Sequence, residues 1–101
     1  MIAVIFEVTP REGRAGDYFD TAAALKEEVE AVDGFISVER FESLTTPGKY
    51  LSISLWRDED AVKTWRENMS HQAAQAKGKA EIFDDYHIRI TEIVREYSSG
   101  Q

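Results

Sequence analysis

The order in which two apolar periodicities alternate along the chain is the feature that most constrains its fold. Strand-like segments rich in β-branched and aromatic residues are predicted at residues 2–8, 35–42, 50–57 and 85–97. Helical periodicity is predicted over 15–32 and 58–68. The resulting order, strand–helix–strand–strand–helix–strand, is that of the split βαβ arrangement. We therefore predict an α+β, ferredoxin-like domain with a four-stranded antiparallel sheet.

Residues that start or stop regular structure lie at the expected boundaries. Pro10 stops the first strand, and Gly34 provides the left-handed conformation that closes the first helix. Pro47-Gly48 forms a tight turn that makes the second and third strands a hairpin. Asp58 is a good N-cap for the second helix, and Ser70 is expected to begin a separate short helix that reaches residue 77.

Length and charge limit the partners that the chain is expected to have. Its 101 residues allow one domain, which we place at 1–97, with a frayed tail at 98–101. A net charge of −7 repels nucleic acid and anionic membrane surfaces, and no apolar run is long enough to span a bilayer. The first residues do not resemble a signal peptide, and the chain contains no cysteine, which fits the cytoplasm.

Two helices cover only one face of a four-stranded sheet, so the other face needs a partner. We expect the covered face to carry Ile36, Val38, Leu51, Ile53, Leu55, Ile88 and Ile90. We expect the second face to carry Phe35, Ser37, Glu39, Phe41, Tyr50, Ser52, Ser54, Trp56, His87, Arg89 and Thr91. Four aromatic residues on that face predict a homodimer joined sheet to sheet. The alternative is that they lie exposed among polar neighbours.

A candidate small-molecule pocket is marked by two tryptophans and a histidine. Trp56 ends the third strand, Trp65 follows in the next helix, and His71 lies just beyond it. These residues are predicted to meet near one end of the sheet, where His71 is a proton shuttle suited to neutral pH. The alternatives are that the tryptophans belong to the core and that His71 has a surface or capping role.

Other polar and aromatic residues near the fourth strand have two interpretations each. Phe83 and Tyr86 are candidates for a pocket lid, or equally for packing between helix and sheet. His87 and Arg89 neutralise an anionic substrate or, as we favour, form a salt bridge with Glu39. The acidic cluster of Glu81, Asp84 and Asp85 is expected to be a solvated surface. Two histidines far apart, with no ligand-spaced motif, predict no metal site.

Several segments together resemble the antibiotic biosynthesis monooxygenase superfamily of dimeric α+β barrels. The pattern runs from Ile53 to Glu59, with Trp56 inside it, and continues with Trp65 and Ser70-His71. Residues 35–41 after Asp33-Gly34 and the closing segment 94–97 are similar to that family as well. The resemblance covers almost the whole chain and implies a dimer with a small-molecule pocket in each subunit.

The resemblance implies two kinds of chemistry, and this chain departs from both patterns. Members that oxidise phenols without metal or flavin pair an asparagine, a tryptophan and a tyrosine, at positions held here by Ser52, Trp56 and Val62. Members that degrade haem use a tryptophan that matches Trp65 and a histidine at the position of Gln75. They also use an asparagine in the first strand, which is absent here, and His71 lies about one helical turn too early.

On this resemblance we expect a monooxygenase that needs no cofactor and acts on a small aromatic or quinol-like substrate. Trp56 and Trp65 would shape the pocket, Ser52 would orient the substrate, and His71 would act as general base. The second interpretation is a non-catalytic, small-molecule-binding dimer. The third is a protein that binds or degrades haem.

Overall fold

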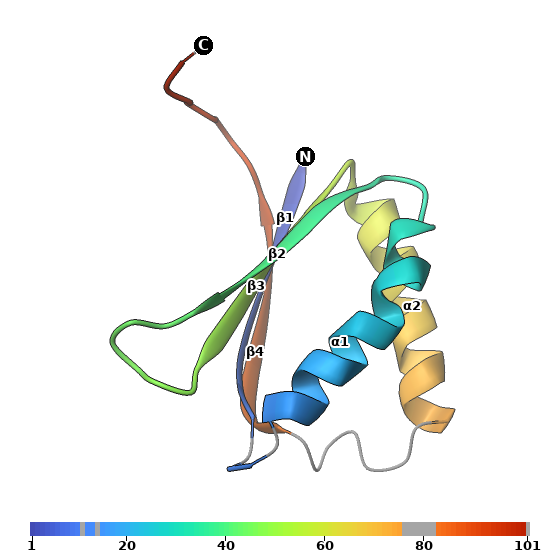
Figure 1. Ribbon diagram of the computed structural model, residues 1–101. Coiled ribbons are helices and arrows are strands. Elements are labelled where there is room, and N and C mark those ends of the chain that lie inside the picture. Colours follow the sequence, from blue (N-terminus) through green and yellow to red (C-terminus); the bar gives the residue numbers. More distant parts are fainter. Residues whose placement is uncertain (11, 14, 76–82, 101) are drawn as a thin grey trace.

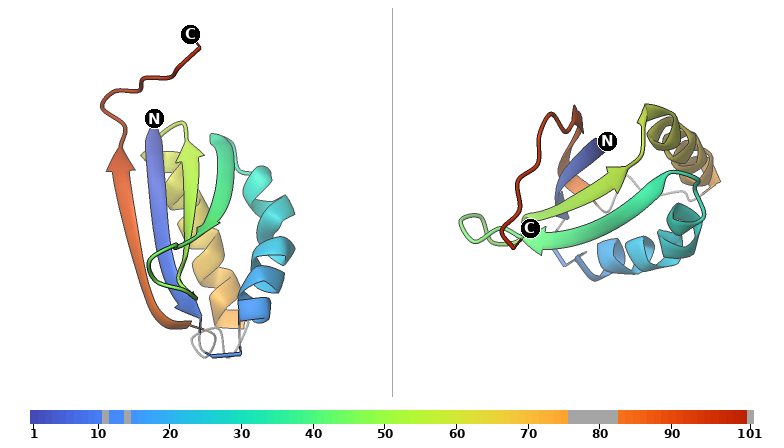
Figure 2. Two further views of the ribbon diagram at one scale, coloured as in Figure 1. Left: turned by 60° about the vertical axis from the view of Figure 1, so that its left-hand side comes forward. Right: turned by 90° about the horizontal axis from the view of Figure 1, so that it is seen from above.

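The computed structural model describes residues 1–10, 12–13, 15–75 and 83–100. Both helices of this described part pack on one side of a four-stranded sheet (Figure 1), and neither is long and apolar enough to cross a membrane. The elements are β1 (Ile2–Pro10), α1 (Ala15–Glu30), β2 (Phe35–Glu42), β3 (Tyr50–Trp56), α2 (Glu59–Gln75) and β4 (Phe83–Glu92). The strands are antiparallel in the order β2-β3-β1-β4, with β1 and β3 in the centre (Figure 2). The predicted ferredoxin-like α+β fold is therefore confirmed.

The register between strands decides which side chains face the helices. Val4 of β1 lies opposite Ser54 on β3 and Ile90 on β4, and Ser54 lies opposite Val38 on β2. Residues directly opposite one another share a face of the sheet. Val4 packs against the core beneath the helices, so this whole row faces α1 and α2.

The core is concentrated where β3 ends and α2 begins. Ile2, Trp56, Ala61 and Val62 form a buried cluster, and Trp56 is only 1% exposed. The Phe35 ring meets the indole of Trp56 edge-on, with ring centroids 5.2 Å apart. Partly buried side chains surround this cluster, namely Val4, Val29, Val32, Phe35 and Trp65. This packing fixes the start of α2 against the sheet.

The predicted orientation of β3 was wrong. Trp56 and Tyr50 face the helices, because Trp56 lies in the core and the Tyr50 ring contacts Phe19 of α1 at 5.0 Å. Phe35 also faces the helices, since a register shift after it places Ser37 on the opposite face. The expected assignment failed because both faces of β3 carry apolar residues, so alternation alone did not indicate which face was covered. Leu51, Ile53 and Leu55 therefore lie on the face away from the helices.

That uncovered face, which we call the open face, combines an apolar centre with charged edges. Its centre is formed by Ala3, Ile5, Leu51, Ile53 and Leu55. Glu7 lies beside this centre and pairs with Arg89 at 3.3 Å and with Lys49 at 3.6 Å. The hydrogen bond from Arg89 is the largest cause that lowers the pKa of Glu7 below its ordinary value. Arg89 thus forms a salt bridge, as favoured, but with Glu7 instead of the expected Glu39.

Several element boundaries differ from those predicted. β1 continues to Pro10 instead of ending at Val8. Pro10 pairs only with β4, because the pairing of β1 with β3 ends at Val8, so no residue of β3 loses a hydrogen bond to the missing proline N–H. α2 runs without interruption to Gln75, so Ser70 does not begin a separate helix. No glycine or proline lies between Glu59 and Gln75, and a serine within a helix costs only a few tenths of a kcal/mol. The predicted end at Gly78 lies outside the described residues, and β4 ends at Glu92 instead of Tyr97.

Two segments project from the body on the side away from the helices. The β2–β3 hairpin loop and the C-terminal arm, residues 93–100, both leave the sheet on that side (Figure 1). Each carries apolar side chains that the domain does not cover: Leu44 is fully exposed at the hairpin, and Val94 and Tyr97 are 82% and 87% exposed on the arm.

Gly34 joins α1 to β2 where the chain passes close to α2. Its φ is +99°, and its carbonyl oxygen accepts a hydrogen bond of 2.7 Å from the Arg57 backbone N–H. A Cβ placed on Gly34 would lie 2.7 Å from the Cβ of Ala61. Only glycine satisfies both the backbone conformation and this close approach.

We predict that Gly34→Ala lowers the free energy of unfolding by about 2–4 kcal/mol, because strain and steric overlap add. Gly48 has a similar φ of +85° but open space around it, so Gly48→Ala should cost only about 1–2 kcal/mol. Urea unfolding of both variants measures the difference. Equal losses would show that the contact with Ala61 is unimportant.

Candidate functional site

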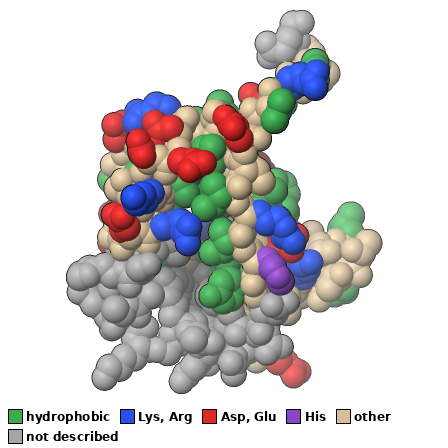
Figure 3. All heavy atoms as spheres, turned by 180° about the vertical axis from the view of Figure 1, so that it is seen from behind, with side chains coloured by type: hydrophobic (Ala, Val, Ile, Leu, Met, Phe, Trp, Pro, Cys, Tyr) green, Lys and Arg blue, Asp and Glu red, His purple; other side chains and the backbone are tan. Residues whose placement is uncertain are grey.

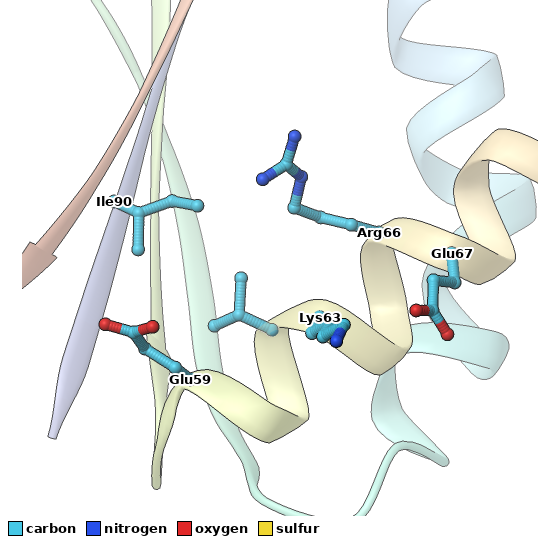
Figure 4. Close-up of a pocket in the computed structure, with 6 residues that line it drawn as sticks. Glu59, Lys63, Arg66, Glu67 and Ile90 are labelled. Carbon is cyan, nitrogen blue, oxygen red and sulfur yellow. The ribbon is translucent and has the colours of Figure 1, made fainter.

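A pocket of about 570 Å³ lies between α2 and β4. Its described lining residues are Glu59, Val62, Lys63, Arg66, Glu67 and Ile90. Five of them belong to α2, and Ile90 points toward that helix from β4 (Figure 4). The molecule carries a column of apolar side chains with charged side chains beside it on the face seen in Figure 3. A pocket of this size accommodates a small organic molecule.

Two small residues of β3 lie in the layer between the sheet and the helices. Ser52 and Ser54 alternate with the outward-facing apolar residues of β3 and therefore face the helices. The indole N–H of Trp56 donates a hydrogen bond of 2.9 Å to the Ser54 hydroxyl. Small side chains at these two positions fill less of the layer between sheet and helices than the Tyr50 and Trp56 rings on either side.

The predicted site residues with described side chains lie around the pocket, not in its wall. Trp56 is buried in the core, and Trp65 packs against the same core from α2. Ser52 is half-buried on the helix-facing side of β3. Tyr86 is 58% exposed, with its ring centroid 6.1 Å from that of Phe6. Tyr86 lies on the same face of β4 as Ile90, since they are four residues apart on one strand.

Two predicted residues have side chains outside the described part of the structure. His71 belongs to α2 by its backbone, and Phe83 begins β4. Four residues separate Glu67 from His71, so their backbone positions lie about one helical turn apart along α2. His87 is on the open face, opposite Glu7, and is therefore separated from the pocket by the sheet.

Sequence reasoning missed the charged residues that line the pocket. Lys63 and Arg66 are exposed and make no ion pair with any described residue. A signal was present, because Glu59, Val62, Lys63, Arg66 and Glu67 recur at spacings of three and four, which place them on one side of a helix. Within the described residues, no three histidine, aspartate or glutamate side chains gather as metal ligands.

The start of α2 is held in place by a charged cap. The Asp58 carboxylate accepts a hydrogen bond of 3.0 Å from the Ala61 backbone N–H, as the sequence predicted for an N-cap. Arg57 donates to Asp58 at 3.2 Å and to Asp33 at 3.1 and 3.4 Å. The hydrogen bond from the Ala61 backbone N–H is the largest cause of the lowered pKa of Asp58. The hydrogen bond to Asp33 is the largest cause of the raised pKa of Arg57.

The fold and the pocket define a class of protein, a small ferredoxin-like domain with a ligand-sized site between helix and sheet. Residues 1–77 match the family model described as antibiotic biosynthesis monooxygenase. This chain therefore belongs to the antibiotic biosynthesis monooxygenase family.

Comparison with individual proteins agrees with this assignment. The chain is 39% identical over its whole length to a protein of Pyricularia oryzae named jasmonate monooxygenase ABM, of which it spans only about half, 47%. It is 31% identical to the uncharacterized protein YqjZ of Bacillus subtilis, over 93% of this chain and 80% of that protein. The solved structure of Rv0793 from Mycobacterium tuberculosis shares the fold, with a TM-score of 0.79, 20% identity and coverage of 96% and 98% of the two chains.

We predict that the Asp58 cap makes a pH-dependent contribution to stability. A carboxyl whose folded pKa is lowered stabilises the fold above its unfolded pKa of about 4, and this contribution is lost as pH falls through the folded pKa. Asp58→Asn keeps a capping side chain but removes the charge, so wild type should exceed the variant in stability at pH 6 and by a smaller margin at pH 3, below the unfolded pKa. Thermal unfolding at both values tests this; an advantage that does not change with pH would contradict it.

Proposed function

We propose that this protein is a monooxygenase that needs no cofactor and acts on a small aromatic or quinol-like substrate in the pocket between α2 and β4. Membership of the antibiotic biosynthesis monooxygenase family is the observation that carries this proposal. A relative of 39% identity that is named a monooxygenase supports it, although this chain spans only about half of that protein.

The proposed reaction uses the substrate as its own reductant. Loss of a phenolic proton gives an anion electron-rich enough to pass an electron to dioxygen. One oxygen atom then becomes a quinone carbonyl on a ring carbon, and the second oxygen leaves as water with the hydrogen of that carbon and the proton taken from the phenol. The substrate supplies all the electrons, so the balance requires no external donor.

We assign the proton transfer to His71, because an imidazole has its ordinary pKa near neutral pH. Its backbone position on α2, one turn beyond Glu67, supports this role. Ser52 is proposed to orient the substrate by hydrogen bonding, and Trp65 with Phe83 and Tyr86 to enclose it. Trp56 is proposed to act from the core as a positioning residue, since only 1% of it is exposed.

We predict that His71→Ala lowers oxygen consumption with a hydroquinone or anthrone substrate by about 100-fold or more, as for a lost acid–base group. His87→Ala is the matched control, because His87 lies on the other face of the sheet and should leave the rate unchanged. An oxygen electrode measures both. If His71→Ala retains the wild-type rate, His71 is not the base.

A second candidate function is a binding module without catalysis. The observation that favours it is that none of the described pocket-lining side chains is an imidazole; they are carboxylates, cations and apolar groups. A binder would be protected against thermal unfolding by a hydroquinone but would consume no oxygen. No observation on the described residues favours the haem interpretation, which a Soret band on addition of haemin would restore.

We further propose that two copies associate through their open faces. The centre of that face is apolar, with Ile5, Leu51, Ile53 and Leu55 on the side of the sheet opposite the two described helices. The β2–β3 hairpin and the C-terminal arm carry exposed apolar side chains and project on the same side (Figure 1). A second sheet packed there would remove this surface from water, at roughly 25 cal/mol for each Å² of apolar area.

We predict that wild type scatters light at micromolar concentration as a particle of twice the chain mass of 11.5 kDa. Ile53→Asp places a charge at the centre of the open face and should raise the dimer dissociation constant by about 100-fold or more. Ala23→Asp, on an exposed position of α1, is the matched control and should remain dimeric. A monomeric wild type, or a dimeric Ile53→Asp, would refute this interface.

A further inference from the structure

Two cations line the described part of the pocket, and only one of them has acidic residues three or four positions away on α2. Lys63 lies four residues from both Glu59 and Glu67, so its charge is offset along α2. Around Arg66, the residues three and four positions away are Val62, Lys63, Met69 and Ser70, none of which is acidic. Within the described structure Arg66 makes no ion pair. Its positive charge is therefore available to a ligand.

The position of Arg66 brings this charge to an apolar surface. Its side chain reaches from α2 toward the sheet, on the side of the pocket where Ile90 points back from β4, whereas the Glu67 side chain points in a different direction from the same helix (Figure 4). Val62 is buried one turn earlier on the same helix and completes the apolar wall. A planar guanidinium beside an apolar wall fits a ligand with a carboxylate at one end and an apolar body.

We propose that the pocket selects monocarboxylates: the carboxylate pairs with the Arg66 guanidinium, and the apolar body lies against Val62 and Ile90. Glu59 and Glu67 on the same wall, together with the net charge of −7, disfavour ligands with several negative charges. This inference rests on the proposed function in taking this pocket as the substrate site. It adds the substrate class and the residue that determines specificity.

Matched pairs of ligands separate recognition of the carboxylate from burial of the apolar body. The probes are jasmonic acid, 2-naphthoic acid and 4-phenylbutyric acid, each compared with its methyl ester at pH 7 by titration calorimetry under nitrogen. Wild type should bind at least one acid about 10- to 100-fold more tightly than its ester, as expected for a charge-assisted hydrogen bond in place of a neutral group.

Substitutions at Arg66 test which residue provides this preference. In Arg66→Gln, the dissociation constants of acid and ester should lie within about threefold of each other, with no weakening of ester binding. Arg66→Lys should retain part of the preference for the acid, because lysine keeps the positive charge but lacks the planar, bidentate guanidinium. Lys63→Gln is the matched control and should keep most of the preference. Circular dichroism confirms that each variant is folded.

Each outcome decides the proposal. It is wrong if no probe binds, if no acid is preferred, if the preference survives Arg66→Gln, or if that change weakens acid and ester equally. Because binding is measured without oxygen, a preference that depends on Arg66 in a protein that consumes no oxygen supports the carboxylate site and refutes the monooxygenase. Oxygen consumption by a protein that shows no Arg66-dependent preference for the acid supports the monooxygenase and refutes the carboxylate site.

Discussion

The packing of Trp56 against the first turn of α2 is the interaction on which the rest of the structure depends. The indole ends β3, contacts Phe35 from β2 and lies in one cluster with Ile2, Ala61 and Val62. It therefore joins three strands and the second helix at one point. Truncation of a buried tryptophan costs roughly 3–5 kcal/mol, a large part of the stability of a domain this small. Gly34 and the Asp58 cap act at the same point, because both hold the chain close to the start of α2.

The pocket lies beside this anchored end of α2. Val62 belongs both to the core cluster with Trp56 and to the pocket wall, and Ile90 of β4 lines the same pocket from the sheet. The wall opposite the sheet is formed by α2, on which apolar Val62 lies among charged residues. A single helix therefore supplies both the surface that binds an apolar body and the charge that orients it.

Much of the architecture was predictable because it depends on local signals. The alternation in β2, the Pro47-Gly48 turn and the Asp58 cap each specify a local conformation, and the element order followed from them. The orientation of β3 was not predictable in this way, because Leu51, Ile53 and Leu55 alternate as regularly as a core-facing set does. Arg66 was missed for a related reason: an arginine on an amphipathic helix is typically solvated, and only the position of Ile90 on a distant strand makes it part of a pocket wall.

The sequence by itself determined the identity and order of the elements, since backbone preferences and apolar periodicity act over a few residues. It also determined that one face of the sheet lacks helices to cover it. Only the tertiary structure decided which side chains occupy each face, because that choice depends on the register of β1 with β3 and β4. It likewise decided that α2 and β4 line one pocket, since residues 62 and 90 come to the same space only after the sheet has formed.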